Sequence, residues 1–164
     1  MKFDTSIVKA HYESPLGTMI VAATACGLAG VWFDGQRHLP DHSRWPVQAD
    51  HPVLRQAQAQ LGEYFAGTRN AFDLPLDLQG GTAFQRSVWD ALLAIPRGGT
   101  TSYGTLSRSI GQPAAVRAVG AAVGRNPLSI VVPCHRVVGA DGSLTGYAGG
   151  LERKTALLRL EGVA

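Results

Sequence analysis

A thiol beside an imidazole is the most reactive feature of this sequence. Cys134 and His135 follow a run of three β-branched residues, 130–132, which predicts a strand that Pro133 ends. Cys134 should therefore lie on a turn, and the cationic side chains of His135 and Arg136 beside it favour a thiolate. Because the thiolate is the nucleophilic form of cysteine, Cys134 is a candidate for covalent chemistry.

Metal binding and hydrolysis are two other uses of such a cysteine. A zinc site needs several ligands at close spacing, and the one other cysteine, Cys26, lies in apolar surroundings where we expect a structural role. We therefore predict no metal. A cysteine hydrolase would pair Cys134 with a distant histidine, and the chain offers His11, His38, His42 and His51. That class would leave the basic second half of the chain without a purpose.

A carboxylate near the end of the chain could complete a relay with His135. In the helix expected over residues 151–161, Leu151, Lys154, Leu158 and Glu161 share one stripe. An acid in the last turn faces the negative end of the helix dipole, at a cost of about 0.3–1 kcal/mol. Glu161 is therefore either a solvated side chain or a carboxylate that orients His135. Adjacent side chains usually diverge, so we expect the imidazole to reach the thiol through a water.

Two helices separated by a short turn could position a nucleic acid near this thiol. The pattern predicts helices over residues 102–110 and 114–124 around Gly111, the outline of a helix-turn-helix. The second helix is built from Ala, Gly and Val, and Arg117 is its one charge. Such a helix either packs in the core or lies close to a nucleic-acid groove. An unpaired buried Arg117 would cost several kcal/mol, which counts against full burial.

The remaining elements form an α+β arrangement. Short apolar runs at 7–12, 19–25 and 28–33 predict an antiparallel meander, followed by a loop over 34–51 and a helix over 52–66. Residues 72–78 alternate, although Pro75 makes them an edge strand or an extended linker. After Gln79-Gly80-Gly81 the pattern becomes helical, beginning with a capping box of Thr82 and Gln85. We therefore predict domains at 1–79 and 80–164.

The charge of the chain divides at the same place. Residues 1–79 carry a net charge of −2 and residues 80–164 a net charge of +5, so the overall +3 is uneven. Such a split either points to a polyanion partner for the second half or is a chance fluctuation in a small sample. Two cysteines in 164 residues exclude a disulfide framework. With no apolar stretch of roughly 20 residues and no signal pattern, we expect no membrane association.

Glycines surround the segment that follows the thiol. Gly146-Tyr147-Ala148-Gly149-Gly150 is either a phosphate cradle or a mobile loop, and it is neither a Walker motif nor a dinucleotide fingerprint. Beside a reactive cysteine, such a segment suggests a pocket that a flat group enters closely.

Together these motifs resemble the O6-alkylguanine-DNA alkyltransferases. The active-site segment of that family resembles Pro133-Cys134-His135-Arg136-Val137. The resemblance covers most of residues 80–164 and continues through Phe84–Trp89, Ser102–Gly104, Ala115–Gly120, Asn126–Pro127 and Gly146–Gly150. The first half is looser, with similarity at residues 14–17 and 64–67.

The resemblance implies a fold and a reaction. The fold is an N-terminal ribonuclease-H-like α/β domain followed by a helical C-terminal domain with a winged-helix-like helix-turn-helix. Members of the family bind double-stranded DNA from the minor groove and flip the damaged base. They then move the alkyl group of O6-alkylguanine, or less readily O4-alkylthymine, irreversibly to their cysteine without a cofactor. A related class binds the lesion as a non-enzymatic sensor, but it lacks the acceptor cysteine that Cys134 supplies here.

The resemblance also implies roles for single residues. Cys134 is the acceptor, His135 the base acting through a water, and Glu161 the residue that orients His135. Asn126 holds the thiol–imidazole region together, and Tyr103 rotates the nucleotide and assists the leaving guanine. The expected DNA contacts are Arg117, Tyr103, Ala118, Ala121, Arg125 and Arg136. The expected lining of the base pocket is Tyr147, Ala148, Gly149 and Lys154.

Further expectations concern metal binding, the residue at position 148, the oligomeric state and the compartment. Thr5, Thr24 and Ala29 stand where some relatives carry zinc ligands, so the resemblance also implies no metal. Ala148 stands where other members carry serine, which puts a side-chain contact from that position in doubt. We expect a monomer and leave cooperative binding on DNA open. We expect a cytoplasmic protein, or a nuclear one in a eukaryote.

Overall fold

A three-stranded antiparallel sheet forms the first half of the protein. The computed structural model describes residues 1–163. The strands β1 (Val8–Ser14), β2 (Gly17–Thr24) and β3 (Gly27–Phe33) pair in the order β1-β2-β3. In the register, Val21 of β2 lies opposite Ala10 on one side and Val31 on the other. The predicted meander is confirmed.

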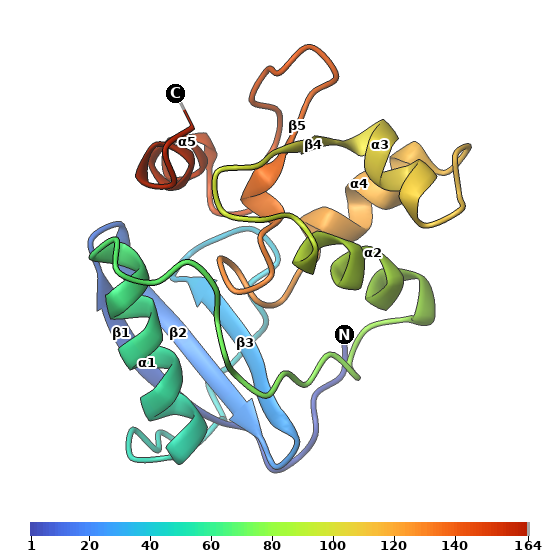
Figure 1. The fold of residues 1–164 in the computed structure, drawn as a ribbon. Helices are drawn as coiled ribbons and strands as arrows, with labels where there is room; N and C mark the ends of the chain where they lie inside the picture. The colour runs from blue at the N-terminus through green and yellow to red at the C-terminus, as the bar shows by residue number, and fades with distance from the viewer. Residues whose placement is uncertain (164) are drawn as a thin grey trace.

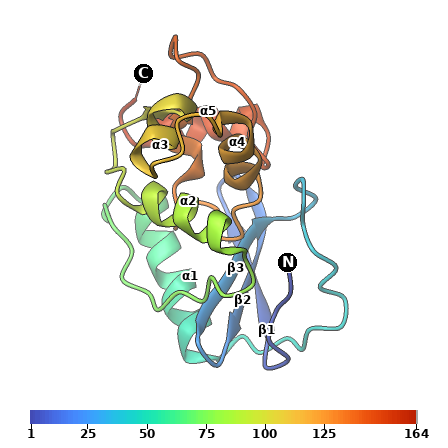
Figure 2. The same ribbon diagram turned by 90° about the vertical axis from the view of Figure 1, so that its right-hand side faces the viewer.

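A different segment of the chain packs on each face of the sheet. Helix α1 (Pro52–Phe65) packs on one face through Leu54, Ala57 and Leu61 (Figures 1 and 2). The helix starts where predicted because Pro52 suits a first turn and the His51 side chain caps it. The loop over residues 34–51 covers the opposite face with an aromatic cluster that includes Trp45.

The segment after α1 runs along the free edge of β3. Leu28 bonds through its amide to the carbonyl of Pro75 and through its carbonyl to the amide of Asp77. The short bridge matches the prediction of an edge segment, since Pro75 offers no amide to a central ladder.

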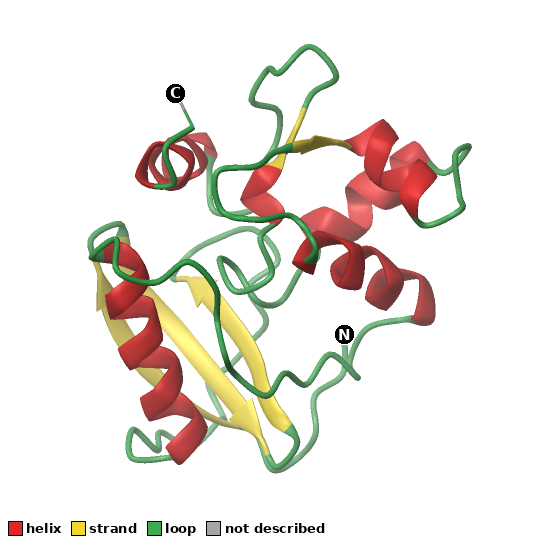
Figure 3. Cartoon of the chain, in the orientation of Figure 1, coloured by secondary structure: helices red, strands yellow, loops and turns green. Residues whose placement is uncertain are grey.

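The second half is mainly helical and lies beyond one end of the strands (Figures 1 and 3). Its helices are α2 (Ala83–Leu93), α3 (Tyr103–Ser109), α4 (Val116–Gly124) and α5 (Leu151–Leu160). The predicted capping box of Thr82 and Gln85 begins α2. The indole of Trp89 donates to the carbonyl of Ala122 at 2.8 Å and so ties α2 to α4.

Helices α3 and α4 form the predicted helix-turn-helix. The turn between them contains Gly111 at φ +73°, a conformation that glycine adopts without strain. A small parallel pair, β4 (Thr101–Ser102) with β5 (Val137–Val138), links the start of α3 to the segment after Cys134. The thiol and the helix-turn-helix are therefore held in one unit.

The predicted strand at residues 130–132 is wrong. Leu128 forms a single bridge with Val31, and the chain then turns with Ile130 at φ +73°, a strained value for a β-branched residue. The amide of Val132 returns to the carbonyl of Leu128 at 2.8 Å, so no ladder can form. As predicted, Cys134 follows Pro133 on a turn, which is the 3₁₀ helix η1 (Cys134–Arg136).

One apolar core runs through both halves. Buried side chains from the sheet, α1, α2, α4 and α5 pack in a single cluster. At its rim, Arg153 of α5 stacks 4.4 Å from the ring centre of Phe33 and donates to the carbonyl of Leu16. Among the helices described, none is long and apolar enough to cross a membrane.

Candidate active site

Cys134 lies at a small cavity between the two halves of the chain. Its side chain is buried, with 6 % of the residue exposed, and the cavity encloses about 150 Å³. The cavity is smaller than the roughly 300–1,000 Å³ of typical small-molecule pockets, which favours one compact group. The lining residues are Arg37, His38, Tyr103, Gly120, Val123, Gly124, Cys134, Gly146, Tyr147 and Ala148.

Burial, not its cationic neighbours, sets the state of the thiol. Removal from water raises the pKa of Cys134, and the nearby Asn126 amide and Lys154 ammonium oppose this only in part. The prediction that His135 and Arg136 favour a thiolate is wrong, since both direct their polar atoms to Glu161. The thiol therefore rests protonated and needs a base when it reacts.

His135 and Glu161 form the predicted pair. The Nε2 atom of His135 lies 2.7 Å from Oε2 of Glu161, and both side chains are fully buried. Burial lowers the pKa of His135, and the adjacent Glu161 opposes that shift only partly, so the imidazole is neutral at rest. If Nε2 donates to Glu161, Nδ1 carries the lone pair. Among the described residues Nδ1 has no partner, so it can take a proton.

Glu161 is held as a carboxylate by several donors. Its burial would raise the pKa, but hydrogen bonds from His135, Arg136 and Tyr64 outweigh that cost and hold the pKa well below its usual range. Arg136 donates from Nε to Oε1 at 2.8 Å and from Nη2 to Oε2 at 2.9 Å. The expected inward position of Glu161 at the end of α5 is confirmed.

Asn126 organises the turn before the thiol. Its amide nitrogen donates to the carbonyls of Val132, at 2.7 Å, and Leu128, at 3.3 Å, and its oxygen accepts from the amide of Leu128 at 3.0 Å. These bonds satisfy backbone groups that a strand would otherwise pair. Asn126 thereby holds residues 128–132 in the conformation that presents Cys134.

One side of helix α4 faces solvent beside the cavity. Arg117, Ala118 and Ala121 are exposed, as is Arg125 just after the helix, whereas Val119 is buried in the core. Within residues 1–163, no ion pair holds Arg117. The core reading therefore holds for one face of α4, and the other face presents small residues and Arg117 to solvent.

The same arrangement occurs in known proteins. Residues 7–78 match the family model of the 6-O-methylguanine DNA methyltransferase ribonuclease-like domain, and residues 83–163 match that of its DNA-binding domain. The methylated-DNA–protein-cysteine methyltransferase of Mycobacterium tuberculosis is 48% identical over 92% of each chain. That of Methanosarcina acetivorans is 47% identical over 93% of this chain and 97% of its own.

This chain belongs to the 6-O-methylguanine DNA methyltransferase family. Its structure agrees with that of the Mycobacterium tuberculosis O6-methylguanine methyltransferase, with a TM-score of 0.85 at 46% identity over 94% of this chain and 92% of the other. The Mycobacterium tuberculosis protein in complex with DNA gives a TM-score of 0.84, covering 94% of this chain and 91% of the other. The predicted fold class, a ribonuclease-like domain before a DNA-binding domain, is confirmed.

Two residues that were predicted to contact DNA or the base are buried in the structure. Arg136, expected at the DNA, is buried because its guanidinium binds Glu161 and the carbonyl of Ile95. Lys154, expected in the base pocket, is fully buried beneath it and bonds the carbonyls of Val137, at 2.6 Å, and Thr145, at 2.8 Å. Burial lowers the pKa of Lys154 to about 8, so it remains an ammonium at pH 7.

Of the other residues predicted to line the pocket, two line the cavity and one lies behind it. Tyr147 and Ala148 line the cavity, and the Tyr147 hydroxyl is buried without a partner among the described residues. Gly149 lies behind them, and a Cβ there would stand 2.7 Å from the Tyr147 ring. Gly149 therefore lets the ring pack and does not itself line the cavity.

Three further residues complete the site: Arg37 and Tyr64, which had no predicted role, and His38, which was named only as a possible partner in a cysteine hydrolase. Arg37 and His38, from the loop after β3, line the cavity, and the amide of Arg37 donates to the carbonyl of Ala148 at 3.0 Å. Tyr64 of α1 donates to Glu161. No local pattern marks these positions, although the match at residues 64–67 to the family was a usable signal for Tyr64.

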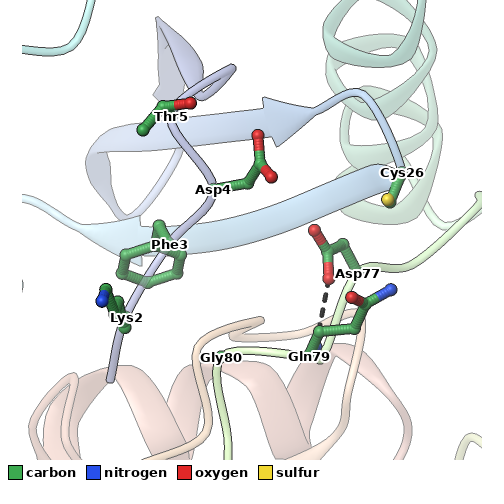
Figure 4. Close-up of a pocket in the computed structure, with 8 residues that line it drawn as sticks. All are labelled: Lys2, Phe3, Asp4, Thr5, Cys26, Asp77, Gln79 and Gly80. Carbon is green, nitrogen blue, oxygen red and sulfur yellow. Dashed lines mark hydrogen bonds between the residues drawn. The ribbon is translucent and has the colours of Figure 1, made fainter.

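Cys26 lies far from this site and is not buried. It is exposed in the turn between β2 and β3, beside a second cavity that Lys2, Asp4 and Asp77 help to line (Figure 4). The expectation of a structural cysteine in apolar surroundings is wrong, because Cys26 and its neighbour Ala25 are both exposed in this turn. Thr24, at the end of β2, donates to Asp77 at 2.5 Å beneath that cavity.

Proposed function

We propose that the protein repairs DNA by direct reversal, moving an alkyl group from O6 of guanine to Sγ of Cys134. One observation carries the proposal: a buried thiol lines a cavity of about 150 Å³, and the next residue in the chain, His135, is paired with the buried carboxylate of Glu161. Membership of the methyltransferase family supports the same reaction.

Helix α4 is proposed to meet double-stranded DNA in the minor groove. The exposed small residues Ala118 and Ala121 allow close approach, and Arg125 supplies a cation for phosphate. Flipping a base costs a few kcal/mol of unstacking, and an inserted side chain can fill the gap. Arg117 is the side chain in position to do so, since it projects from the exposed start of α4.

The flipped base is proposed to enter the cavity beside Tyr103 and Tyr147. The Tyr103 ring packs against Gly120 of α4, where a Cβ would stand 3.7 Å from it. Tyr103 thus lies between the helix at the groove and the thiol, and it can follow the nucleotide inward. The partnerless hydroxyl of Tyr147 can bond an edge of the base, and the backbone at Ala148 closes the cavity.

The transfer balances as a direct displacement. Nδ1 of His135 takes the thiol proton through a bridging water, and Sγ attacks the alkyl carbon. The S–C bond forms as the C–O6 bond breaks, and the electron pair stays with guanine, which Tyr103 protonates. The proton on His135 returns through solvent to the Tyr103 phenolate. The thioether has no route back to the thiol, so each molecule acts once.

The proposal also covers the lesion, the cofactor requirement, the oligomeric state, the domains and the compartment. O6-alkylguanine is proposed as the main lesion, with O4-alkylthymine accepted less readily. The displacement requires no cofactor. We propose a monomer with domains at 1–79 and 80–164, acting in whichever compartment holds the genome, the cytoplasm or a eukaryotic nucleus.

A stoichiometric repair assay tests the proposal. A duplex with one O6-methylguanine is mixed in molar excess with the protein, and restored guanine is measured over time. We expect a plateau at one repaired lesion per protein molecule, while Cys134→Ser binds the duplex and repairs nothing. Binding without repair by the wild-type protein would favour the lesion sensor, and a reaction that continues past the plateau would contradict single use of Cys134.

A further inference from the structure

One residue of the first half reaches the proton relay. Tyr64, on α1, donates from its hydroxyl to Oε2 of Glu161 at 2.5 Å, and both side chains are buried. The same oxygen lies 2.7 Å from Nε2 of His135. Tyr64 and His135 therefore share one carboxylate oxygen, although Tyr64 lies on a helix that covers the sheet (Figure 1).

The Tyr64 ring has little freedom to move its hydroxyl elsewhere. The ring is packed by Phe65, with centres 5.4 Å apart and near-perpendicular planes, and by Phe72 at 5.6 Å. The guanidinium of Arg97 lies 5.2 Å from the ring centre. Arg97 is itself fixed, because it donates to the carbonyls of Arg69 and Leu160. The hydroxyl is thus aimed at Glu161 by surroundings that neither touch the thiol nor line its cavity.

Sharing an oxygen has an electrostatic consequence. Oε2 of Glu161 accepts from Tyr64, from His135 and from Nη2 of Arg136, while within residues 1–163 Oε1 accepts only from Nε of Arg136. Each donor draws negative charge from the oxygen that faces the imidazole. The Tyr64 hydroxyl therefore weakens the hold of Glu161 on a protonated His135. Together with the two bonds from Arg136, it also holds the carboxylate in its orientation toward His135.

We propose that Tyr64 is a positioning residue of the alkyl transfer, which sets the orientation of Glu161 and the strength with which it attracts the His135 proton. The role rests on the proposed function, since it acts through the relay. It gives the ribonuclease-like half of the chain a part in the chemistry as well as in the fold.

The other charged groups around His135 act from the second half. Arg136 and Lys154 both disfavour a proton on the imidazole, and Glu161 favours one. The Cys134 thiol lies beside it in η1. Tyr64 is the group that α1 adds to this set, so its removal changes one contribution and leaves the four others in place.

Tyr64→Phe in the full-length protein tests the role without removing the ring. The readout is the ¹⁵N signal of the His135 imidazole, titrated by NMR from acid to neutral pH. We expect its midpoint to rise by about half a pH unit, a roughly threefold change in the protonation equilibrium, because Glu161 loses a competing donor. Tyr12→Phe is the matched control, since Tyr12 also packs near α1, beside Gly62, and makes no contact with Glu161.

A second readout separates this role from a structural one. In Tyr64→Phe, the pH at which methyl transfer falls off on the acid side should rise by the same amount as the NMR midpoint. A uniform loss of rate at all pH values, or an unmoved His135 midpoint in the folded variant, would overturn the proposal. If wild type transfers no methyl group, the proposed reaction fails, while the NMR titration still tests the coupling.

A third form of the protein covers the case in which Tyr64→Phe does not fold. Site-specific 3-fluorotyrosine at position 64 keeps the hydroxyl and makes it a stronger donor. The His135 midpoint should then move downward, opposite to the shift in Tyr64→Phe. No shift, or an upward shift, would contradict the role of Tyr64.

Discussion

Cys134 and His135 are neighbours in the chain, yet their polar atoms face different ways. The imidazole turns its Nε2 to Glu161, and burial keeps the thiol protonated. A protonated thiol is a safe resting state for a residue that reacts only once, because free alkylating agents attack thiolates. In the proposed reaction the lesion must therefore arrive before His135 takes the proton.

The protonation state of His135 predicts a pH dependence. Burial lowers its pKa below the usual 6.5, so the neutral imidazole predominates at pH 6.5 and above. Transfer of a methyl group should therefore stay near its full rate at pH 7 and fall as pH decreases through the lowered pKa. Single-turnover rates measured from pH 5 to pH 8 check this. An acid-side fall centred above pH 6.5 would contradict a neutral resting imidazole.

At the residue scale, the sequence predicted which groups gather at the site but not all of the groups that hold them. Cys134, His135 and Glu161 carry chemical signatures that a sequence displays. The sequence does not display the partners of Arg136 and Lys154, because a cationic residue that binds phosphate has the same identity as one that binds a buried carbonyl or carboxylate. Tyr64 was also hidden, because it meets Glu161 across 97 positions in the chain.

At the scale of elements, α4 serves two surfaces at once. Its buried side packs against α2 and α3, and its exposed side carries small residues and Arg117. Such a division needs a helix without bulky side chains on its outer face. The Ala, Gly and Val content of residues 114–124 matches this division.

The exposed position of Arg117 predicts a defect specific to duplex DNA. Arg117→Ala should slow repair of O6-methylguanine in a duplex by about tenfold, which corresponds to about 1.4 kcal/mol in activation free energy. The reason is that no side chain then fills the gap that the flipped base leaves in the stack. Repair of the free base, which needs no flipping, should be unchanged. Arg55→Ala on α1 is the control, since Arg55 is also exposed but lies on the helix that covers the sheet. Equal rates for Arg117→Ala and wild type on duplex DNA would remove this role.

Elements with local signals were predicted well, except where tertiary hydrogen bonds override the signal. The capping box at Thr82 and the glycine after residue 110 act within a few residues, so sequence reveals them. The run at 130–132 has strand-forming residues, but Asn126 binds the carbonyls of Leu128 and Val132 and imposes a turn. Tertiary hydrogen bonds there override β propensity.

At the scale of the whole molecule, the sheet and the helices share one core. The cluster that contains Phe33 and Leu61 continues into Trp89 and Val119, and Arg153 spans its rim. The relay itself crosses the same boundary through Tyr64 and Glu161. The charge division seen in the sequence therefore marks where DNA is proposed to bind and does not mark two independent bodies.

A shared core predicts a single unfolding transition. Trp32 and Trp45 report on the first half, and the Trp89→Phe variant leaves only these two tryptophans. Their fluorescence and the far-UV circular dichroism, which includes the helices of the second half, should give the same midpoint in denaturant. Two separated midpoints would show that the halves unfold independently and that the contacts across the boundary are weak.

The central claim is that Cys134 accepts the alkyl group, and mass spectrometry tests it most directly. The protein is incubated with a duplex that contains O6-methylguanine, digested, and the peptide with Cys134 is compared with that containing Cys26. The account predicts one methyl group on Cys134, none on Cys26, and unmodified guanine in the DNA. A repaired duplex with Cys134 unmodified, or a methyl group on another residue, would contradict it.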